Sequence, residues 1–189
     1  MRINKFFTEQ GLCSRREADR LIEEGRITIN GLVAKLGDQV SEGDVVARDG
    51  VVIARDNEAV YIKYHKPAGV TTTSEPDVRR NIIAEINHPA RIFPIGRLDK
   101  DSTGLILLTN DGNIVNEILR VEHGHEREYR VEVDREFDQA FLDRMAAGVM
   151  ILGVMTRPCT VTRLATRTFR IILTEGRNRQ IRRMTQALG

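Results

Sequence analysis

A polar turn that runs directly into a short apolar segment constrains the fold of this chain more than any other feature. Residues 94–104 read PIGRLDKDSTG, and residues 105–109 read LILLT. An apolar run of this length, bounded by turn residues, indicates a buried strand. Asp99 would then lie at the mouth of a buried element, a position typical of a catalytic carboxylate. The alternative is structural, because Asp and Gly beside a strand usually serve as turn residues.

Apolar patterns elsewhere predict further strands and a few helices. Alternation indicates strands at residues 60–64, 129–133 and 169–173, and helical spacing indicates helices at 137–147 and 178–188. Strands interleaved with a few helices are typical of the α+β class. We therefore expect a mixed, mainly antiparallel sheet with flanking helices.

The first fifty residues carry the signals of a small unit of their own. Ser14 and Glu17 can form a capping box, which opens a predicted helix over residues 15–24. A strand over residues 26–29 follows, and the next two residues, Asn30-Gly31, are the strongest short hairpin signal. These patterns predict a compact helix and hairpin module at the N-terminus.

A change in composition predicts where this module ends. Residues 54–59 are polar and weakly patterned, so we expect a linker there. The 189 residues, 41% of them hydrophobic, suit a small domain joined to a medium one. The expected domains are residues 1–56 and 60–189.

Several classes of protein do not fit the composition. No run of about 18 apolar residues is present, and the N-terminus does not read as a signal peptide, so we expect a cytoplasmic protein with no membrane partner. Cys13 and Cys159 belong to no Cys-x-x-Cys pair. His123 and His125 have no further ligand pattern around them. We therefore expect no metal site.

The C-terminal residues 157–189 are strongly basic, although the whole chain has a net charge of only +2. They contain one acid, Glu175, and eight arginines, which gives a net charge of +7. The arginines are Arg157, Arg163, Arg167, Arg170, Arg177, Arg179, Arg182 and Arg183. Guanidinium groups bind phosphate oxygens and stack on bases, so this segment favours a nucleic-acid partner over a membrane. The alternative is a solvated basic face.

A second basic surface is predicted on the helix over residues 15–24. Arg16 and Arg20 lie one turn apart, and Arg15 lies at the helix start, where backbone amides attract anions. The alternative is that the acids of the same helix pair with these arginines on the surface. The order of helix, capped helix and hairpin over residues 2–48 resembles the alpha-L type of RNA-binding module, known from a small-subunit ribosomal protein and from tyrosyl-tRNA synthetases.

Three segments of the second domain together resemble the pseudouridine synthases of the RsuA/RluA superfamily. They are Lys66-Pro67-Ala68-Gly69 with residues 71–73, the turn at residues 96–105, and EGRNRQIRRM at residues 175–184. The sequence of residues 93–102, together with residues 148–153, is similar to the RluF type of the RsuA family, which acts on large-subunit ribosomal RNA. The resemblance implies an RNA uridine isomerase that needs no cofactor.

The resemblance also implies roles for individual residues. Asp99 would be the catalytic aspartate, Tyr129 the active-site tyrosine, and Arg182 the arginine that pairs with the aspartate and keeps it ionised. Asp101, two residues further on, would support the turn with Ser102. The expected RNA-binding residues are Arg2, Lys5, Arg15, Arg16, Arg20, Arg97, Arg177, Arg179 and Arg183. The expected partner is large-subunit ribosomal RNA, with tRNA as the second choice, and the expected state is a monomer.

Two other functions fit some of these features. A non-catalytic RNA-binding protein would need only the N-terminal module and the arginine-rich tail. A sugar hydrolase would need a second carboxylate spaced for general-acid work, and the sequence offers none. Members of the resembled family continue beyond the last arginine-bearing helix, so we expect a catalytic domain that is incomplete at its C-terminus.

Overall fold

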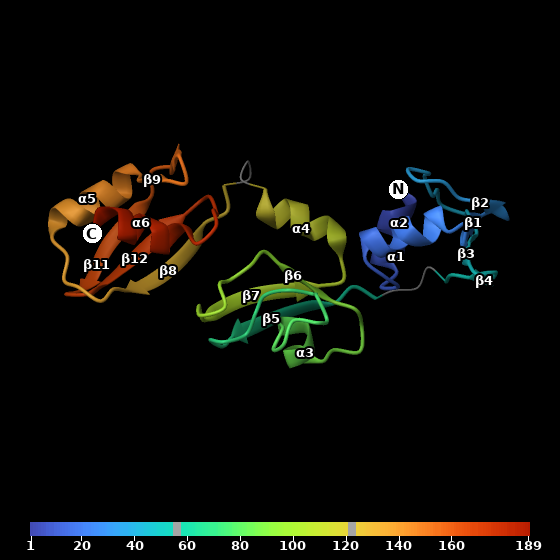
Figure 1. The fold of residues 1–189 in the computed structure, drawn as a ribbon, viewed down its shortest axis with the longest axis horizontal. Coiled ribbons are helices and arrows are strands. Elements are labelled where there is room, and N and C mark those ends of the chain that lie inside the picture. Colours follow the sequence, from blue (N-terminus) through green and yellow to red (C-terminus); the bar gives the residue numbers. More distant parts are fainter. Residues whose placement is uncertain (55–57, 121–123) are drawn as a thin grey trace. The chain divides into compact units, whose positions relative to one another are not determined.

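The computed structural model describes residues 1–54, 58–120 and 124–189 (Figure 1). The chain forms two compact units, Met1–Asn116 and Glu117–Gly189. Both units combine helices with antiparallel strands, so the predicted α+β class is confirmed. None of the helices in the described ranges is long and apolar enough to cross a membrane.

The N-terminal module packs two helices against a four-stranded sheet in the order β2-β1-β3-β4. Its elements are α1 (Ile3–Glu9), α2 (Arg15–Glu23), β1 (Ile27–Ile29), β2 (Leu32–Val33), β3 (Val46–Arg48) and β4 (Val51–Val52). Ser14 caps α2 by accepting a hydrogen bond from the Glu17 backbone at 3.1 Å, as predicted. Asn30 and Gly31 both have positive φ, the conformation that a tight β1–β2 hairpin requires. Phe6, Phe7 and Leu21 anchor the core of this module.

The rest of the first unit is built on a three-stranded antiparallel sheet in the order β5-β7-β6. Its elements are β5 (Tyr61–Lys66), α3 (Ile82–Ile86), β6 (Phe93–Ile95), β7 (Gly104–Thr109) and α4 (Gly112–Leu119), the last of which crosses into the second unit. The apolar run after the Asp99 turn is the central strand β7, as predicted. Ile82 of α3 packs with Ile106 and Leu108 of β7 in a core separate from that of the N-terminal module. Figure 1 shows α3 against this sheet.

The second unit is a three-stranded antiparallel sheet, in the order β11-β12-β8, packed against two helices (Figure 1). Its elements are β8 (Arg127–Glu132), α5 (Gln139–Ala147), β9 (Met150–Ile151), β10 (Val154–Met155), β11 (Thr160–Ala165), β12 (Thr168–Leu173) and α6 (Gln180–Leu188). Phe141 and Met145 of α5, with Met184 of α6, bury against Phe169 and Ile171 of β12. This packing explains the helical spacing that predicts both helices.

All the strand pairs in the described ranges are antiparallel, and one isolated parallel bridge joins Thr71 and Asn81. The catalytic domain expected from sequence thus contains two separate three-stranded sheets, one in each unit. Of the linker predicted at residues 54–59, residues 55–57 lie outside the described part of the chain, as does His123.

Candidate functional site

Asp99 lies in the loop between β6 and β7 and is half-buried. The Ser102 backbone N–H donates a hydrogen bond to the Asp99 carbonyl at 3.1 Å and closes the turn. Asp101 is exposed, so the main chain closes the turn without its side chain. The Asp99 loop, residues 97–102, therefore has the compact form that can hold a carboxylate in a fixed position.

A buried lysine side chain supports the Asp99 loop through hydrogen bonds. Lys66, the last residue of β5, has an exposed fraction of 0%. Its ammonium donates hydrogen bonds to the carbonyls of Pro67 and Val70, both at 2.9 Å, and of Lys100 at 3.1 Å. Three acceptors match the three protons of an ammonium group. Lys66 therefore ties the end of β5 to the residue that follows Asp99.

Burial also affects the titration of this lysine. Desolvation lowers the pKa of Lys66, while the negative charges of Asp101 and Asp99 act in the opposite direction. The Lys66 ammonium thus places a positive charge next to the main chain of the loop that carries the candidate catalytic carboxylate. The sequence motif that contains Lys66 did not predict this structural role. The signal was the alternation along β5, which places Lys66 on the same inward face as Ile62 and Tyr64.

Two more hydrogen bonds hold the loop on either side of Asp99. The hydroxyl of Thr72, 3% exposed, donates to the Leu98 carbonyl at 2.8 Å. The backbone N–H of Gly69 donates to the Lys100 carbonyl, also at 2.8 Å. The residues before and after Asp99 are therefore both attached to the segment 66–72, which follows β5 in the sequence.

Tyr129 lies in the middle of β8 in the second unit, where it pairs with Ile171 of β12. Side chains alternate along β8, and Tyr129 shares the half-buried face with Arg127 and Val131. Its ring packs against the core of that unit. The aromatic ring is therefore held by the sheet on one side, which is a suitable arrangement for a surface on which a base could stack.

Arg182 lies on the first turn of α6 and is exposed.

A buried hydrogen-bond network of Glu175 and Gln180 lies at the start of this helix. Glu175, 7% exposed, accepts hydrogen bonds from the Arg157 backbone at 3.0 Å and from the Gln180 side chain at 3.1 Å. Gln180 in turn accepts from the Arg177 backbone at 2.9 Å. The start of α6, and with it the position of Arg182 in its unit, is thus fixed by Glu175 and Gln180.

The expected catalytic residues are divided between the two units, with Asp99 in the first and Tyr129 and Arg182 in the second. The loop from 97 to 102 also carries Arg97, which is exposed beside the aspartate. Arg97 and Asp99 therefore lie in one loop of the first unit, and Tyr129 and Arg182 lie on separate elements of the second.

The predicted basic surface of α2 separates into two kinds of arginine. Arg15 and Arg16 are exposed, and among the described residues no carboxylate forms an ion pair with either. Arg20 forms an ion pair with Glu17 at 2.6 Å and lies 3.8 Å from Glu24. The surface-pair interpretation therefore applies to Arg20, while Arg15 and Arg16 keep their positive charge available to an RNA phosphate.

The other expected RNA-binding residues differ in the same way. Arg2 is exposed, whereas Lys5 lies 3.4 Å from Glu9. Arg177 pairs with Glu175 at 3.2 Å. Arg183 donates to the Asn178 carbonyl at 3.0 Å and to its side-chain oxygen at 3.1 Å. Arg179 is exposed and has left-handed backbone geometry, with φ 50°.

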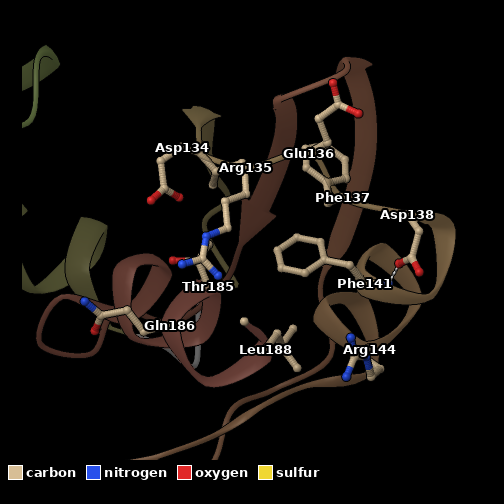
Figure 2. Close-up of a pocket in the computed structure, with 12 residues that line it drawn as sticks. Asp134, Arg135, Glu136, Phe137, Asp138, Phe141, Arg144, Thr185, Gln186 and Leu188 are labelled. Carbon is tan, nitrogen blue, oxygen red and sulfur yellow. Dashed lines mark hydrogen bonds between the residues drawn. The ribbon is translucent and has the colours of Figure 1, made fainter.

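A cavity of about 550 Å³ lies elsewhere in the second unit, between residues 133–144 and the end of α6. Figure 2 shows Phe141 projecting into it, with Arg135 and Leu188 around the ring. Neither Tyr129 nor Arg182 lines it. Within the described ranges, no cluster of three or more His, Cys, Asp or Glu side chains could hold a metal ion.

Comparison with known proteins assigns both parts of the chain. Residues 60–187 match the RNA pseudouridylate synthase family, and residues 1–46 match the S4 domain. A solved structure described as a crystal structure of pseudouridylate synthase superposes with a TM-score of 0.69 at 29% identity, over 100% of this chain and 84% of that one.

Two curated relatives are similar over the whole of this chain. The dual-specificity RNA pseudouridine synthase RluF of Escherichia coli (strain K12) is 50% identical, and the match covers 66% of its length. The ribosomal large subunit pseudouridine synthase B of Bacillus subtilis (strain 168) is 34% identical, and the match covers 80% of its length. The chain thus spans about two thirds of the RluF relative. With a matching family segment that contains Asp99, Tyr129 and Arg182, this chain belongs to the RNA pseudouridylate synthase family.

Proposed function

We propose that this chain is an RNA pseudouridine synthase that isomerises a uridine in large-subunit ribosomal RNA, with Asp99 as its catalytic residue. The observation that carries the proposal is the support of the Asp99 loop. Lys66, Gly69 and Thr72 hold the main chain on both sides of Asp99, within the segment that matches the family. A degenerate RNA-binding scaffold would have no need to fix one exposed loop in this way.

The reaction explains why one carboxylate can be enough. The bond between the sugar carbon C1′ and N1 of uracil breaks, the base rotates, and a new bond joins C1′ to C5, which loses its proton while N1 gains one. The reaction is redox neutral, and a carboxylate can stabilise or attack the electron-poor sugar as it does in glycosidases. The uridine must leave its base stack to reach Asp99.

We assign supporting roles to two residues of the second unit. Tyr129 would provide a ring against the displaced uracil and a hydroxyl for proton transfer, which suits its half-buried place in β8. Arg182 would pair with Asp99, and the Glu175 and Gln180 network supports this role because it fixes the start of α6.

RNA binding would use exposed cations in both parts of the chain. Arg2, Arg15 and Arg16 would bind phosphates from the S4 domain, and Arg97 would do so beside Asp99. Arg179, exposed in the segment before α6, stays a predicted phosphate contact whatever its present partners. We infer smaller contributions from the cations with carboxylate or amide partners, which are Lys5, Arg20, Arg177 and Arg183.

We propose a domain boundary within residues 57–59. The separate hydrophobic cores of residues 3–53 and 60–108 support domains at residues 1–56 and 60–189. The relative named for the large ribosomal subunit supports a ribosomal RNA substrate. A monomeric state, a cytoplasmic location and the lack of a membrane partner stay predictions from the sequence. The "dual-specificity" name of the RluF relative supports a test of a second class of RNA, for which we choose tRNA.

The test compares two aspartates of the same loop. The purified chain, Asp99→Ala and Asp101→Ala are incubated with unmodified transcripts of large-subunit ribosomal RNA and of tRNA, and pseudouridine is measured by mass spectrometry. We expect Asp99→Ala to lose all product while its RNA affinity stays within about twofold, because the aspartate contributes to the transition state rather than to phosphate binding. Asp101→Ala should retain activity, since its exposed side chain does not close the turn. Pseudouridine formation by Asp99→Ala would refute the proposal, and release of free uracil would indicate a hydrolase.

A further inference from the structure

One arginine near the Asp99 loop has a backbone conformation that its residue type does not favour. Arg80 has φ +55°, in the left-handed region. Asn, Asp and Gly adopt this region readily, whereas other L-residues do so at a cost in free energy. Such a conformation persists only where the surrounding structure imposes it, and it is frequent at functional sites.

The surroundings of Arg80 do impose it. The Thr71 backbone N–H donates to the Arg80 carbonyl at 2.9 Å, and Thr71 forms a parallel bridge with Asn81. Asn81 is 4% exposed, and its amide donates to the Val78 carbonyl at 3.0 Å, while its oxygen accepts from the Ala84 backbone at 2.8 Å. The loop that leads into α3 is therefore fixed on both sides of Arg80.

This conformation places the Arg80 guanidinium over a glycine. A Cβ atom added to Gly69 would lie 3.4 Å from Nη1 and 3.9 Å from Cζ of Arg80. Gly69 itself has φ +85° and donates its N–H to the Lys100 carbonyl, one residue beyond Asp99. The missing side chain of Gly69 thus leaves room for a guanidinium beside the peptide that supports the Asp99 loop.

Nothing in the described part of the chain neutralises this guanidinium. Arg80 is exposed, and no carboxylate or carbonyl of the described residues pairs with its side chain. An exposed cation with no protein partner does not stabilise the strained backbone that holds it. The arrangement is instead suited to an anion that arrives from outside.

We propose that Arg80 is an RNA-binding residue, which contacts a phosphate of the substrate strand beside the uridine on which Asp99 acts. The proposal rests on the proposed function, and it names a residue outside the three segments that carry the family resemblance. Arg97 lies two residues before the aspartate, so Arg80 would give the flipped strand a second phosphate contact, from the segment before α3.

The left-handed backbone supplies a sharp test, because glycine removes the guanidinium and the strain together. Wild type, Arg80→Gly and Arg80→Lys are compared with Arg79→Ala, a control that removes the exposed arginine next to it, whose φ is not positive. For each, Tm is measured, as are the salt dependence of binding to an unmodified Escherichia coli large-subunit ribosomal RNA transcript and kcat/KM for pseudouridine formation.

We expect Arg80→Gly to melt at or above the wild-type Tm and yet to bind RNA about tenfold more weakly. The slope of log Kobs against log salt should become shallower by about 0.7 to 0.9, the effect of one lost phosphate contact. Arg80→Lys should keep most of the slope, and Arg79→Ala should match wild type.

Two results would overturn the proposal. An unchanged slope in Arg80→Gly, whatever its Tm, would assign the guanidinium to packing over Gly69. An equal loss of slope in Arg79→Ala would show that any cation of this loop serves as well. A wild-type chain that binds the transcript but makes no pseudouridine would instead refute the proposed function, and the slopes would still decide whether Arg80 binds RNA.

Discussion

The ammonium of Lys66 donates a hydrogen bond to the carbonyl of Lys100 over 3.1 Å, across 34 positions of sequence. This contact joins the end of β5 to the loop that carries Asp99. The same ammonium binds the carbonyls of Pro67 and Val70, so one buried cation organises two turns. The Asp99 loop therefore depends on the buried Lys66 ammonium. A substitution of Lys66 should disturb the loop although it changes no exposed residue.

Lys66→Met tests this dependence. Methionine approximates the shape of the lysine stem but removes the ammonium that binds the carbonyls of Pro67 and Val70, and it leaves the Lys100 carbonyl with only the Gly69 N–H. We therefore expect the free energy of unfolding to fall by about 3 kcal/mol. In a preparation that still folds, the rate of pseudouridine formation at saturating RNA should fall further than RNA affinity, because the loop and not the basic surface is affected. Lys63→Met is the control, since Lys63 is exposed on the same strand. Equal stability of the two variants would contradict the role given to Lys66.

The lowered pKa of Lys66 predicts a dependence of stability on pH. Burial disfavours the charged form in the folded state, so between the folded-state pKa and about 10.4 the unfolded chain binds more protons than the folded one. Stability therefore rises with pH across this window, and the rise ends above it. Urea unfolding of wild type and Lys66→Met between pH 8 and 10.5 isolates the effect as a difference that grows with pH. A difference that stays flat would show that the three carbonyls compensate fully for burial.

Glu175→Gln tests the network in front of α6. Glu175 accepts from the Arg157 backbone and from Gln180, and it pairs with Arg177 at 3.2 Å, so loss of its charge should cost about 2 kcal/mol. Because this network fixes the start of the helix that carries Arg182, the maximal reaction rate should fall as well. Glu128→Gln is a matched control, since its pairing with Arg170 at 3.8 Å is exposed. Wild-type rate and stability in Glu175→Gln would show that α6 begins correctly without the carboxylate.

The parts of the fold that could be predicted from the sequence are mostly those specified by neighbouring residues. The Ser14 cap, the Asn30-Gly31 turn and the apolar run of β7 are each specified by adjacent residues, and the structure confirms them. The α3 helix has only five residues, too short to show a helical period. Strand β8 begins at Arg127, two residues before the predicted start at residue 129. Arg127 pairs with Leu173 of β12, a contact between residues far apart in sequence that local patterns do not reveal.

The site shows the same limit. A lysine at a strand end usually reaches solvent, and nothing near Lys66 in sequence indicates that Lys100 would accept its hydrogen bond. The strained backbone of Arg80 is likewise imposed by Thr71 and Asn81, not by the residue type of Arg80. Motifs therefore identify which residues react, while tertiary contacts decide which residues hold them in place.

Gly148 and Gly153 offer a matched pair for the hairpin of β9 and β10. Both have positive φ, +104° and +75°. A Cβ at Gly148 would lie 2.6 Å from the Thr156 carbonyl oxygen, whereas a Cβ at Gly153 would meet no atom within 4 Å. We expect Gly153→Ala to cost about 1 kcal/mol, the cost of the left-handed backbone alone, and Gly148→Ala to cost about 3 kcal/mol or more. Chemical denaturation measures both, and equal losses would mean that the chain around Thr156 moves aside at little cost.

The S4 domain provides the last test, because two arginines one turn apart on α2 differ in their partners. Arg16 is exposed with no carboxylate partner among the described residues, whereas Glu17 and Glu24 raise the pKa of Arg20 and already neutralise its charge. Arg16→Ala should therefore make the salt dependence of RNA binding shallower by about 0.7 to 0.9, and Arg20→Ala should change it by much less. Because Arg20 must lose its own ion pairs before it can bind a phosphate, its contribution to affinity should also be the smaller. Binding isotherms at four or more salt concentrations distinguish the two variants. A larger effect of Arg20→Ala than of Arg16→Ala would mean that RNA displaces Glu17 and Glu24 from Arg20.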